Sequence, residues 1–182
     1  MANAAAEVEF VSIDLQLKDG RRVMLRAVRA DDKEKLQATL RGLSAESRYA
    51  RFMAPLRELS PQMLERATRP DAERELQLVA AVGEGGQEKI VAGARYSAAP
   101  ESRDCEFAIA ITDEWQGQGL ARLLLETLMR AARARGFERM EGYILATNSR
   151  MLGLAKRLGF AEVTSSEGPT VRLMRRNLAE AS

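Results

Sequence analysis

A turn with two glycines, set between an apolar segment and a leucine-striped segment, most constrains the fold of this 182-residue chain. Residues 104–112 are rich in isoleucine and alanine and predict a strand. Residues 119–135 predict an amphipathic helix. The apolar stripe of that helix consists of Leu120, Leu123, Leu124, Leu128 and Ala131. A strand that runs through a tight turn into such a helix is typical of layered α/β folds.

Further strands and helices are expected on both sides of this turn. Period-two patterns predict strands, while capping residues and proline predict helix starts. The expected strands are residues 11–17, 22–28, 75–82, 90–98, 104–112, 138–146, 160–164 and 170–176. The expected helices are residues 33–43, 44–53, 119–135 and 148–158, with one more that begins at Ser60. We therefore expect a single α/β domain over residues 1–182, with about six to seven strands in a mixed central sheet flanked by helices. Residues 1–7 are expected to be a frayed terminus.

The composition indicates which kinds of binding partner and which cellular location to expect. The chain is 46% hydrophobic and 30% charged, as expected for a globular protein. Its formal net charge of +2 gives no reason to expect nucleic acid or a membrane as partner. Residues 1–10 lack the pattern of a secretory signal, and no segment is long enough to span a bilayer. We therefore expect a cytoplasmic protein.

The chain contains no histidine, which restricts its chemistry. Ser-His and Cys-His nucleophilic sites and imidazole metal sites are excluded. Cys105 is the only cysteine, so an intramolecular disulfide and a cysteine-based zinc site are excluded as well, and we expect no metal. Proton transfer must then use a carboxylate, a lysine, a tyrosine, water or Cys105, which we expect to be a buried structural thiol.

The glycine turn favours an anionic ligand. Gly117 and Gly119 let the backbone turn sharply and let a ligand approach the main chain. Successive free N–H groups and the positive end of the helix dipole then suit a diphosphate. Two alternatives are a turn that only connects strand to helix and a dinucleotide-binding loop. The second fits poorly, because Arg122 occupies the third glycine position of G-x-G-x-x-G and the motif lies deep in the chain.

Two blocks of sequence resemble the GNAT acyltransferases. Gln116-x-x-Gly119-x-Ala121 is similar to their Q/R-x-x-G-x-G/A signature. The block Asn148-x-x-Met151-x-x-Leu154-x-x-x-Leu158-Gly159-Phe160 is similar to the helix that follows the next strand. The resemblance implies acetyl-CoA as the acyl donor. It implies that the donor is held by Gln116, Gly117, Gln118, Gly119, Leu120, Ala121, Arg122 and Asn148. Asn148 equally suits the N-cap of a helix.

A looser resemblance extends toward the N-terminus. Residues 25–52, with S-A-E-S-R-Y-x-R-F at their end, are similar to the GNAT domain of bacterial protein-lysine acetyltransferases. This implies a primary amine as acceptor, either a protein lysine or a small molecule, and a homodimer is a family-level expectation. Arg48 and Arg51 could recognise an acidic acceptor or be ordinary surface arginines.

Glu106 is the expected general base. A lysine-like ammonium has a pKa of about 10.4, so a positioned base is needed to supply the neutral amine near pH 7. Period two places Glu106 on one face with Ala108 and Ala110, whose small side chains leave room, and apolar surroundings should raise its pKa. The resemblance implies the same role, because the protein-lysine acetyltransferases carry their catalytic glutamate at a similar position. The alternative is a solvent-facing charge at a strand edge.

The general acid and the oxyanion donors are expected from the family pattern. It implies that the backbone of Ile109, Ala110 and Ile111 stabilises the oxyanion and also binds the cofactor by pairing with its pantetheine arm. Many members carry a tyrosine as general acid seven residues after the motif asparagine, where this chain has Ala155. The role of general acid is therefore unassigned, and Tyr143 is a candidate to replace the missing tyrosine. We expect direct acetyl transfer from acetyl-CoA to an amine, and the alternative is a non-catalytic module that senses acyl-CoA.

Overall fold

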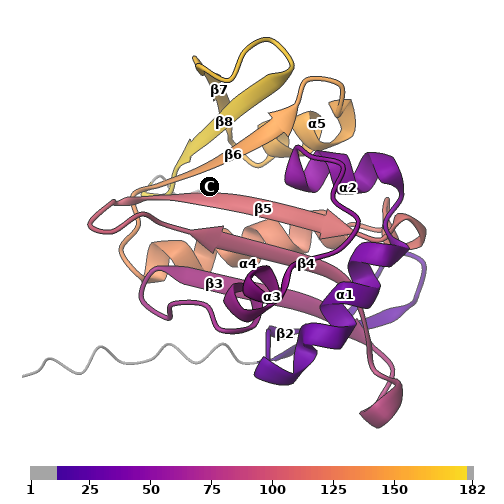
Figure 1. Ribbon diagram of the computed structural model, residues 1–182. Coiled ribbons are helices and arrows are strands. Elements are labelled where there is room, and N and C mark those ends of the chain that lie inside the picture. The colour runs from indigo at the N-terminus through magenta and orange to yellow at the C-terminus, as the bar shows by residue number, and fades with distance from the viewer. Residues whose placement is uncertain (1–11, 180–182) are drawn as a thin grey trace, which may run out of the picture.

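One mixed sheet organises residues 12–179, the part of the chain that the computed structural model describes. Its strands are β1 (Ile13–Gln16), β2 (Arg22–Ala27), β3 (Glu75–Val82), β4 (Lys89–Ser97), β5 (Asp104–Ile111), β6 (Arg139–Leu145), β7 (Ala161–Val163) and β8 (Val171–Asn177). Their order across the sheet is β1-β2-β3-β4-β5-β6-β8-β7 (Figure 1). Every neighbouring pair is antiparallel except β5 and β6, which are parallel.

The sheet in residues 12–179 has eight strands, so the expectation of six to seven was too low. The two shortest strands lie at its edges: β1 has four residues and β7 has three. Both lie within segments expected to be strands, residues 11–17 and 160–164, and hydrogen bonds to β2 and β8 add them to the edges of the one sheet. The expected fraying of residues 1–7 falls outside the described residues.

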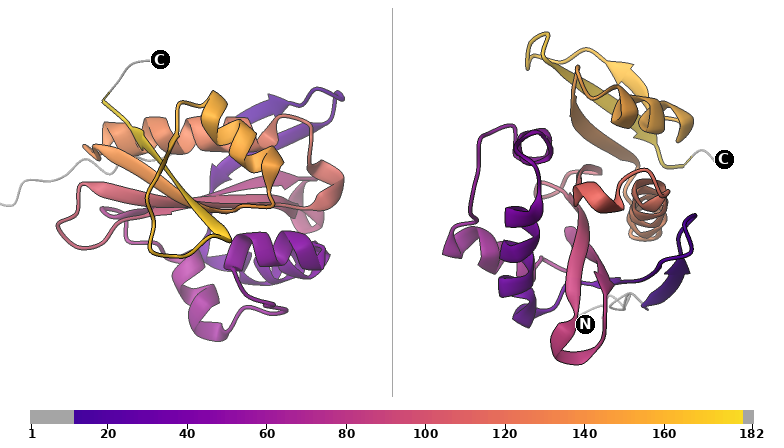
Figure 2. Two further views of the ribbon diagram at one scale, coloured as in Figure 1. Left: turned by 90° about the horizontal axis from the view of Figure 1, so that it is seen from above. Right: turned by 90° about the vertical axis from the view of Figure 1, so that its right-hand side faces the viewer.

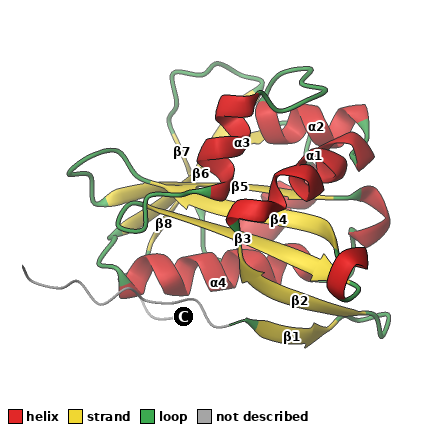
Figure 3. Cartoon of the chain, turned by 60° about the horizontal axis from the view of Figure 1, so that its bottom comes forward, coloured by secondary structure: helices red, strands yellow, loops and turns green. Residues whose placement is uncertain are grey.

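Five α-helices within residues 12–179 cover the two faces of the sheet. They are α1 (Lys33–Gly42), α2 (Ala45–Phe52), α3 (Pro61–Thr68), α4 (Leu120–Ala134) and α5 (Ser149–Arg157). The first three lie on one face, and α4 lies on the opposite face (Figure 3). Helix α5 lies on the same side as α4, beside β6 and β8 (Figure 2). None of the helices in this range is long and apolar enough to cross a membrane.

The leucine stripe of α4 forms the centre of the core beneath the sheet. Leu123 and Ala131 of the expected stripe are only partly buried, whereas the leucines that are at most 1% exposed are Leu120, Leu124, Leu128 and, in addition to that stripe, Leu125. They pack in one cluster with side chains of the sheet, including Tyr96 and Phe107. Burying a leucine contributes about 1.5–3 kcal/mol, so this stripe fixes α4, and with it the preceding turn, against the sheet.

The parallel pair β5 and β6 is joined at one end only. Pairing runs from Asp104 opposite Arg139 to Glu106 opposite Glu141 and stops there. Beyond that point β5 remains paired with β4, and β6 remains paired with β8. The two strands therefore diverge toward their C-terminal ends, as Figure 1 shows.

Gly142 lies directly after the point of divergence. A Cβ atom added there would lie 2.2 Å from the nearest carbon of the Phe107 ring. That ring is only 4% exposed and packs edge to face on Phe160, with 5.4 Å between ring centroids. The absent side chain of Gly142 thus makes room for Phe107 where the strands separate.

The Gly142→Ala substitution is expected to destabilise the protein by about 1–3 kcal/mol, because the buried Phe107 ring has to move. At roughly 2–4 °C per kcal/mol for a chain of this size, differential scanning calorimetry should detect the loss. Gly86→Ala is the control, since a Cβ atom at Gly86 meets nothing within 4 Å. An unchanged melting temperature for Gly142→Ala would contradict this account of the divergence.

A buried ion-pair cluster connects β2, α1 and the start of β4. Arg26 and Asp32 are 2% and 0% exposed, and their two hydrogen bonds measure 2.7 and 2.9 Å. Arg26 also donates to Glu88 at 2.6 Å, and Lys35 donates to Glu88 at 2.8 Å. The cluster fixes the helix layer of α1 over the sheet.

Candidate functional site

The turn at residues 116–121, called here the phosphate turn, presents a row of free backbone donors. Gly117 and Gly119 have φ angles of +77° and +90°, which side chains larger than hydrogen rarely adopt. No N–H group from Gly117 to Arg122 has an acceptor among the residues that the structure describes, and the first helical bond is donated by the N–H of Leu123 to Gly119 at 3.2 Å. Six consecutive free donors at a helix N-terminus are suited to binding an anion.

The side chain of Gln116 holds the phosphate turn in place. Its amide nitrogen donates to the carbonyl of Ile111 at 3.1 Å, to the carboxylate of Asp113 at 3.2 Å and to the hydroxyl of Ser47 at 3.2 Å. Ser47 in turn donates to Asp113 at 2.7 Å. Gln116 therefore links the turn to β5 and to α2, and its side chain is used inside the protein.

The other residues of this segment that were expected to bind acetyl-CoA lie partly in the core and partly at the surface. Leu120 is buried in the core, and Ala121 is partly buried. Gln118 is partly buried, whereas Arg122 is exposed and pairs with Glu126 at 2.8 Å along α4. The groups that this segment leaves free to meet an anion are therefore main-chain N–H groups.

Lys18 is a functional candidate that the sequence analysis missed. It lies at the tip of the β1–β2 hairpin, and its Cε atom is 3.6 Å from the place where a Cβ atom of Gly119 would lie. The hairpin is docked there by Arg21, which stacks on Trp115 at 3.8 Å and donates to the carbonyl of Glu114 at 3.0 Å. A lysine in a hairpin turn has no sequence pattern that marks it as functional. Its place beside Gly119 depends on how the β1–β2 hairpin docks through Arg21.

The gap between β5 and β6 exposes backbone groups of β5. Thr112 donates its N–H to Val91 of β4 at 3.0 Å, so by alternation Ala110 also faces β4. Ile109 and Ile111 then direct their N–H and C=O groups toward β6, beyond the end of the β5–β6 pairing. The carbonyl of Ile111 accepts from Gln116, and the N–H groups of Ile109 and Ile111 remain as donors facing the gap.

Glu106 lies at the start of the gap, on the sheet face covered by α1, α2 and α3. Its side chain is solvent-accessible and has no hydrogen bond or ion pair with any residue in the range 12–179. Partial burial raises its pKa above the usual glutamate value, and Glu141 adds to this, while Arg95 and Arg51 oppose it. An unpaired carboxylate with a raised pKa is suited to accepting a proton.

Tyr143 faces Glu106 across the gap. It follows Glu141 by two residues on β6, and Glu141 is the register partner of Glu106, so all three side chains share one face. Partial burial and the charges of Glu106 and Glu141 raise the pKa of Tyr143, which keeps its phenol protonated at neutral pH. Ala155, at the family's tyrosine position, is fully buried in α5.

Two further residues have structural roles. Cys105 is 2% exposed on the face opposite Glu106, and burial raises the pKa of its thiol to about 12, which disfavours a nucleophilic thiolate. Asn148 is the N-cap of α5, and its side-chain oxygen accepts from the N–H of Met151 at 3.1 Å. Among residues 12–179 there is no cluster of three acidic or cysteine side chains that could hold a metal ion.

A pocket of about 260 Å³ lies between the three helices and the sheet face that carries Glu106. Ala108 and Ala110, the next residues along that face of β5, form part of its floor. Its apolar wall consists of Leu36, Leu40, Leu43, Phe52, Leu59, Met63 and Ile90. Its cationic side chains are Arg51, Arg66 and Arg95. We call this space the helix-side pocket.

Comparisons with known proteins agree with this geometry. The Acetyltransferase (GNAT) family matches residues 40–160. An acetyltransferase of Pseudomonas aeruginosa is 36% identical over 144 residues, which cover 79% of this chain and 77% of that protein. The chain therefore belongs to the GNAT family of acetyltransferases.

Two solved structures share the fold. The GNAT domain of S. lividans PAT superposes with a TM-score of 0.82 at 28% identity, covering 97% of this chain and 99% of that one. The yncA protein of Salmonella typhimurium, a putative acetyltransferase determined with its cofactor acetyl-CoA, gives a TM-score of 0.69 at 20% identity, covering 88% of this chain and 96% of that one. The expectation of a single GNAT-like α/β domain is confirmed.

Proposed function

We propose that the protein transfers an acetyl group from acetyl-CoA to a primary amine, with Glu106 as general base. The observation that carries the proposal is the position of Glu106 beside the β5–β6 gap, which begins where strand pairing ends and leads to the free donors of the phosphate turn. Acetyl-CoA supplies the acetyl group as a thioester. The acceptor is a protein lysine or a small molecule.

The phosphate turn fits the diphosphate of acetyl-CoA. Its six free N–H groups and the positive end of α4 compensate negative charge without a side-chain cation, and Lys18 adds one from the hairpin. The family pattern also assigns Asn148 to this site, in addition to its capping role. The Salmonella structure with bound acetyl-CoA has the same fold, which supports the assignment.

The chemistry requires one bond to form and one to break. The amine nitrogen bonds to the thioester carbonyl carbon, and the bond from that carbon to sulfur breaks. Glu106 accepts the proton that the amine loses, directly or through water. The N–H of Ile109 donates to the carbonyl oxygen as negative charge develops there.

Tyr143 is the general acid in this proposal. The leaving thiolate needs a proton, and the phenol of Tyr143 faces the gap with a raised pKa. A thiol has a pKa of about 8.5, so its anion leaves tolerably well even without full proton transfer. The buried Ala155 at the family's tyrosine position instead favours the alternative of a non-catalytic acyl-CoA sensor, which would bind acetyl-CoA without turnover.

Acetyl-CoA binding is expected to raise the melting temperature of the wild-type protein. At 100 times its dissociation constant, the ligand should add about 2.7 kcal/mol of stability. The Gly119→Glu variant should lose this increase, because a carboxylate beside the free N–H groups repels the diphosphate. Gly119→Ala is the matched control, since it has the same backbone strain without the charge. Equal shifts in both variants, or no shift in the wild type, would remove the acetyl-CoA assignment.

A further inference from the structure

Arg51 is a partly buried cation without a counter-ion. It lies in the last turn of α2 and lines the helix-side pocket. No hydrogen bond or ion pair connects its guanidinium to another residue in the described part of the chain, and the guanidinium makes a cation–π contact with Phe52 at 4.7 Å. Burial, together with the charge of Arg95, lowers the pKa of Arg51 to about 10, and the charge of Glu106 opposes this shift. A desolvated charge of this kind is stabilised when an anion pairs with it.

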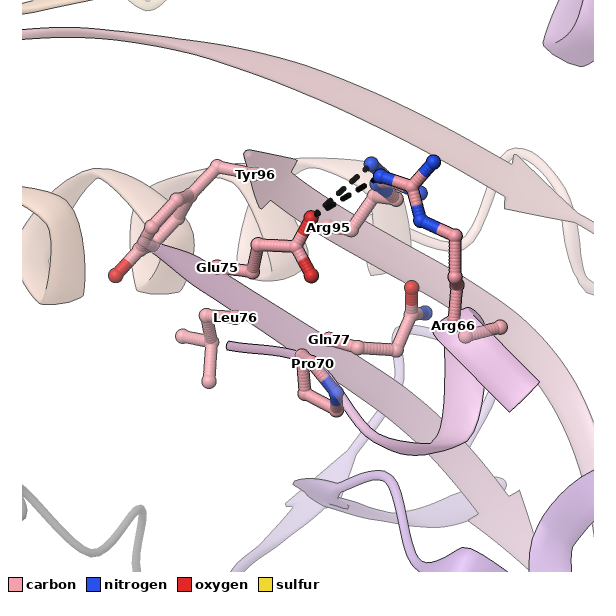
Figure 4. A pocket seen from close by; sticks show the side chains of 8 residues that line it. Arg66, Pro70, Glu75, Leu76, Gln77, Arg95 and Tyr96 are labelled. Atoms are coloured by element: carbon pink, nitrogen blue, oxygen red, sulfur yellow. Dashed lines mark ion pairs between the residues drawn. The ribbon is translucent and has the colours of Figure 1, made fainter. Parts of the chain in front are cut away.

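Arg95 is a second cation that lines the same pocket, and its charge is only weakly paired. Its only ion pair within residues 12–179 is with Glu75, at 3.9 Å, and Glu75 is shared with Arg66 at 3.8 Å. Figure 4, which draws a smaller pocket that shares Arg66, Gln77 and Arg95 with the helix-side pocket, shows the carboxylate of Glu75 facing both arginines. One carboxylate thus faces two arginines at distances too long for strong hydrogen bonds. The pocket contains more positive than negative charge.

The distance between these arginines and Glu106 indicates which acceptor molecule the pocket can hold. Arg95 is the register partner of Ala108, and Glu106 precedes Ala108 by two residues on the same face. Such diagonal neighbours are about 7–8 Å apart across an antiparallel pair. A molecule with its amine at Glu106 can therefore place a carboxylate against Arg51 and Arg95.

We propose that the acceptor is a small primary amine that also carries a carboxylate, held by Arg51 and Arg95 while its amine faces Glu106. The inference rests on the proposed function. The apolar wall formed by α1, α2 and α3 accommodates a hydrocarbon body on the same molecule. A lysine side chain brings no anion, and its ammonium is repelled by the two arginines. The volume of about 260 Å³ is at the small end for ligand pockets, as suits a small acceptor.

Arg48, the other arginine considered on this helix, has a different role. Its guanidinium donates to the carbonyl of Leu43 at 3.0 Å and does not line the pocket. Arg41 of α1 is better suited as a control, because its side chain is 61% exposed and pairs with Glu58 at 2.8 Å on the surface. Losing Arg41 removes one positive charge without changing the pocket.

The test compares each acid with its own amide. Initial rates of CoA thiol release from acetyl-CoA are measured with L-leucine against L-leucinamide and with L-methionine against L-methioninamide. An Nα-acetyl-lysine amide represents the protein lysine. Because a carboxamide makes the neighbouring amine less basic, intrinsic reactivity favours the amide, and a preference for the acid must come from binding.

We expect wild-type kcat/KM to favour the acid by roughly 10- to 100-fold, as hydrogen bonds to a charged group allow. In Arg51→Met the acid-to-amide ratio should fall toward one through a higher KM for the acid. Arg51→Lys should retain part of the preference, because it keeps the charge and loses the planar pair of donors. Arg41→Met should retain all of it.

Three outcomes would overturn the inference: an amide that reacts as well as its acid, a preference that survives in Arg51→Met, or turnover of the lysine derivative alone. Each of these leaves acetyl-CoA binding, measured by the thermal shift, intact. Absence of that shift in the wild type contradicts the proposed function itself, so the two failures are distinguishable.

Discussion

Replacing Glu106 with glutamine is expected to lower kcat/KM for acetyl transfer by about 10²- to 10⁴-fold. Glutamine has nearly the shape of glutamate but accepts no proton from the attacking amine. The side chain has no ion pair or hydrogen bond in the range 12–179, so the substitution should not disturb folding. The thermal shift caused by acetyl-CoA should be unchanged.

The pH dependence gives a second readout of the same residue. Burial raises the pKa of Glu106, so the base becomes protonated, and kcat/KM falls, as pH decreases through a value above the usual glutamate range. This acidic limb should be missing from the profile of Glu106→Gln. Asp104→Asn is the matched control, because Asp104 lies two residues earlier on the same strand face and pairs with Arg139 at 2.7 Å. A Glu106→Gln enzyme with more than about a third of wild-type activity would rule out general-base catalysis by this residue.

Breaking the buried ion pair at Asp32 is expected to cost about 3–5 kcal/mol of folding stability. Asp32 accepts two hydrogen bonds from Arg26 and one from the N–H of Arg29 at 2.7 Å. In Asp32→Asn these donors lose a charged acceptor, and Arg26 is left with Glu88 as its carboxylate partner. The melting temperature should fall by roughly 6–20 °C.

Two further variants separate this effect from general charge loss. Asp19→Asn removes a solvent-accessible ion pair, which joins Asp19 to Arg21 at 2.6 Å, and should change stability little. The double substitution Arg26→Met with Asp32→Leu should recover part of the stability lost in Asp32→Asn, because no buried charge is left unpaired. A melting temperature of Asp32→Asn close to that of Asp19→Asn would show that the cluster contributes little.

Lowering the pH should protonate Asp32 and cause the same loss of folding stability as Asp32→Asn. Burial alone raises the pKa of this carboxyl, but the hydrogen bonds from Arg26 and Arg29 outweigh it and hold the pKa below its usual value. The stabilisation is therefore fully present above the unfolded-state pKa of about 3.9 and is lost as pH falls through the lower folded-state value.

The positions of the helices and strands follow from local sequence. Period-two segments such as residues 139–145 and the leucine stripe of α4 encode which face each element buries, and Ser44 and Ser60 cap their helices through neighbouring N–H groups. The phosphate turn is local as well, because the positive φ angles of Gly117 and Gly119 and the free N–H groups of a helix start need no distant contact. These features therefore could be predicted, together with the family.

The arrangement of the candidate site depends on contacts between residues far apart in sequence. Pairing between β5 and β6 ends at Glu106 and Glu141, and this opens the gap and places Tyr143 on the same face as Glu106. Only the packed helices show that Arg51 lines the pocket and that Arg48 caps a carbonyl. Sequence alone determined the elements and the glycine turn with its free N–H groups, since these depend on backbone dihedrals and periodicity. The tertiary structure decided which side chains meet, because strand register and helix packing combine many distant contacts that no local pattern records.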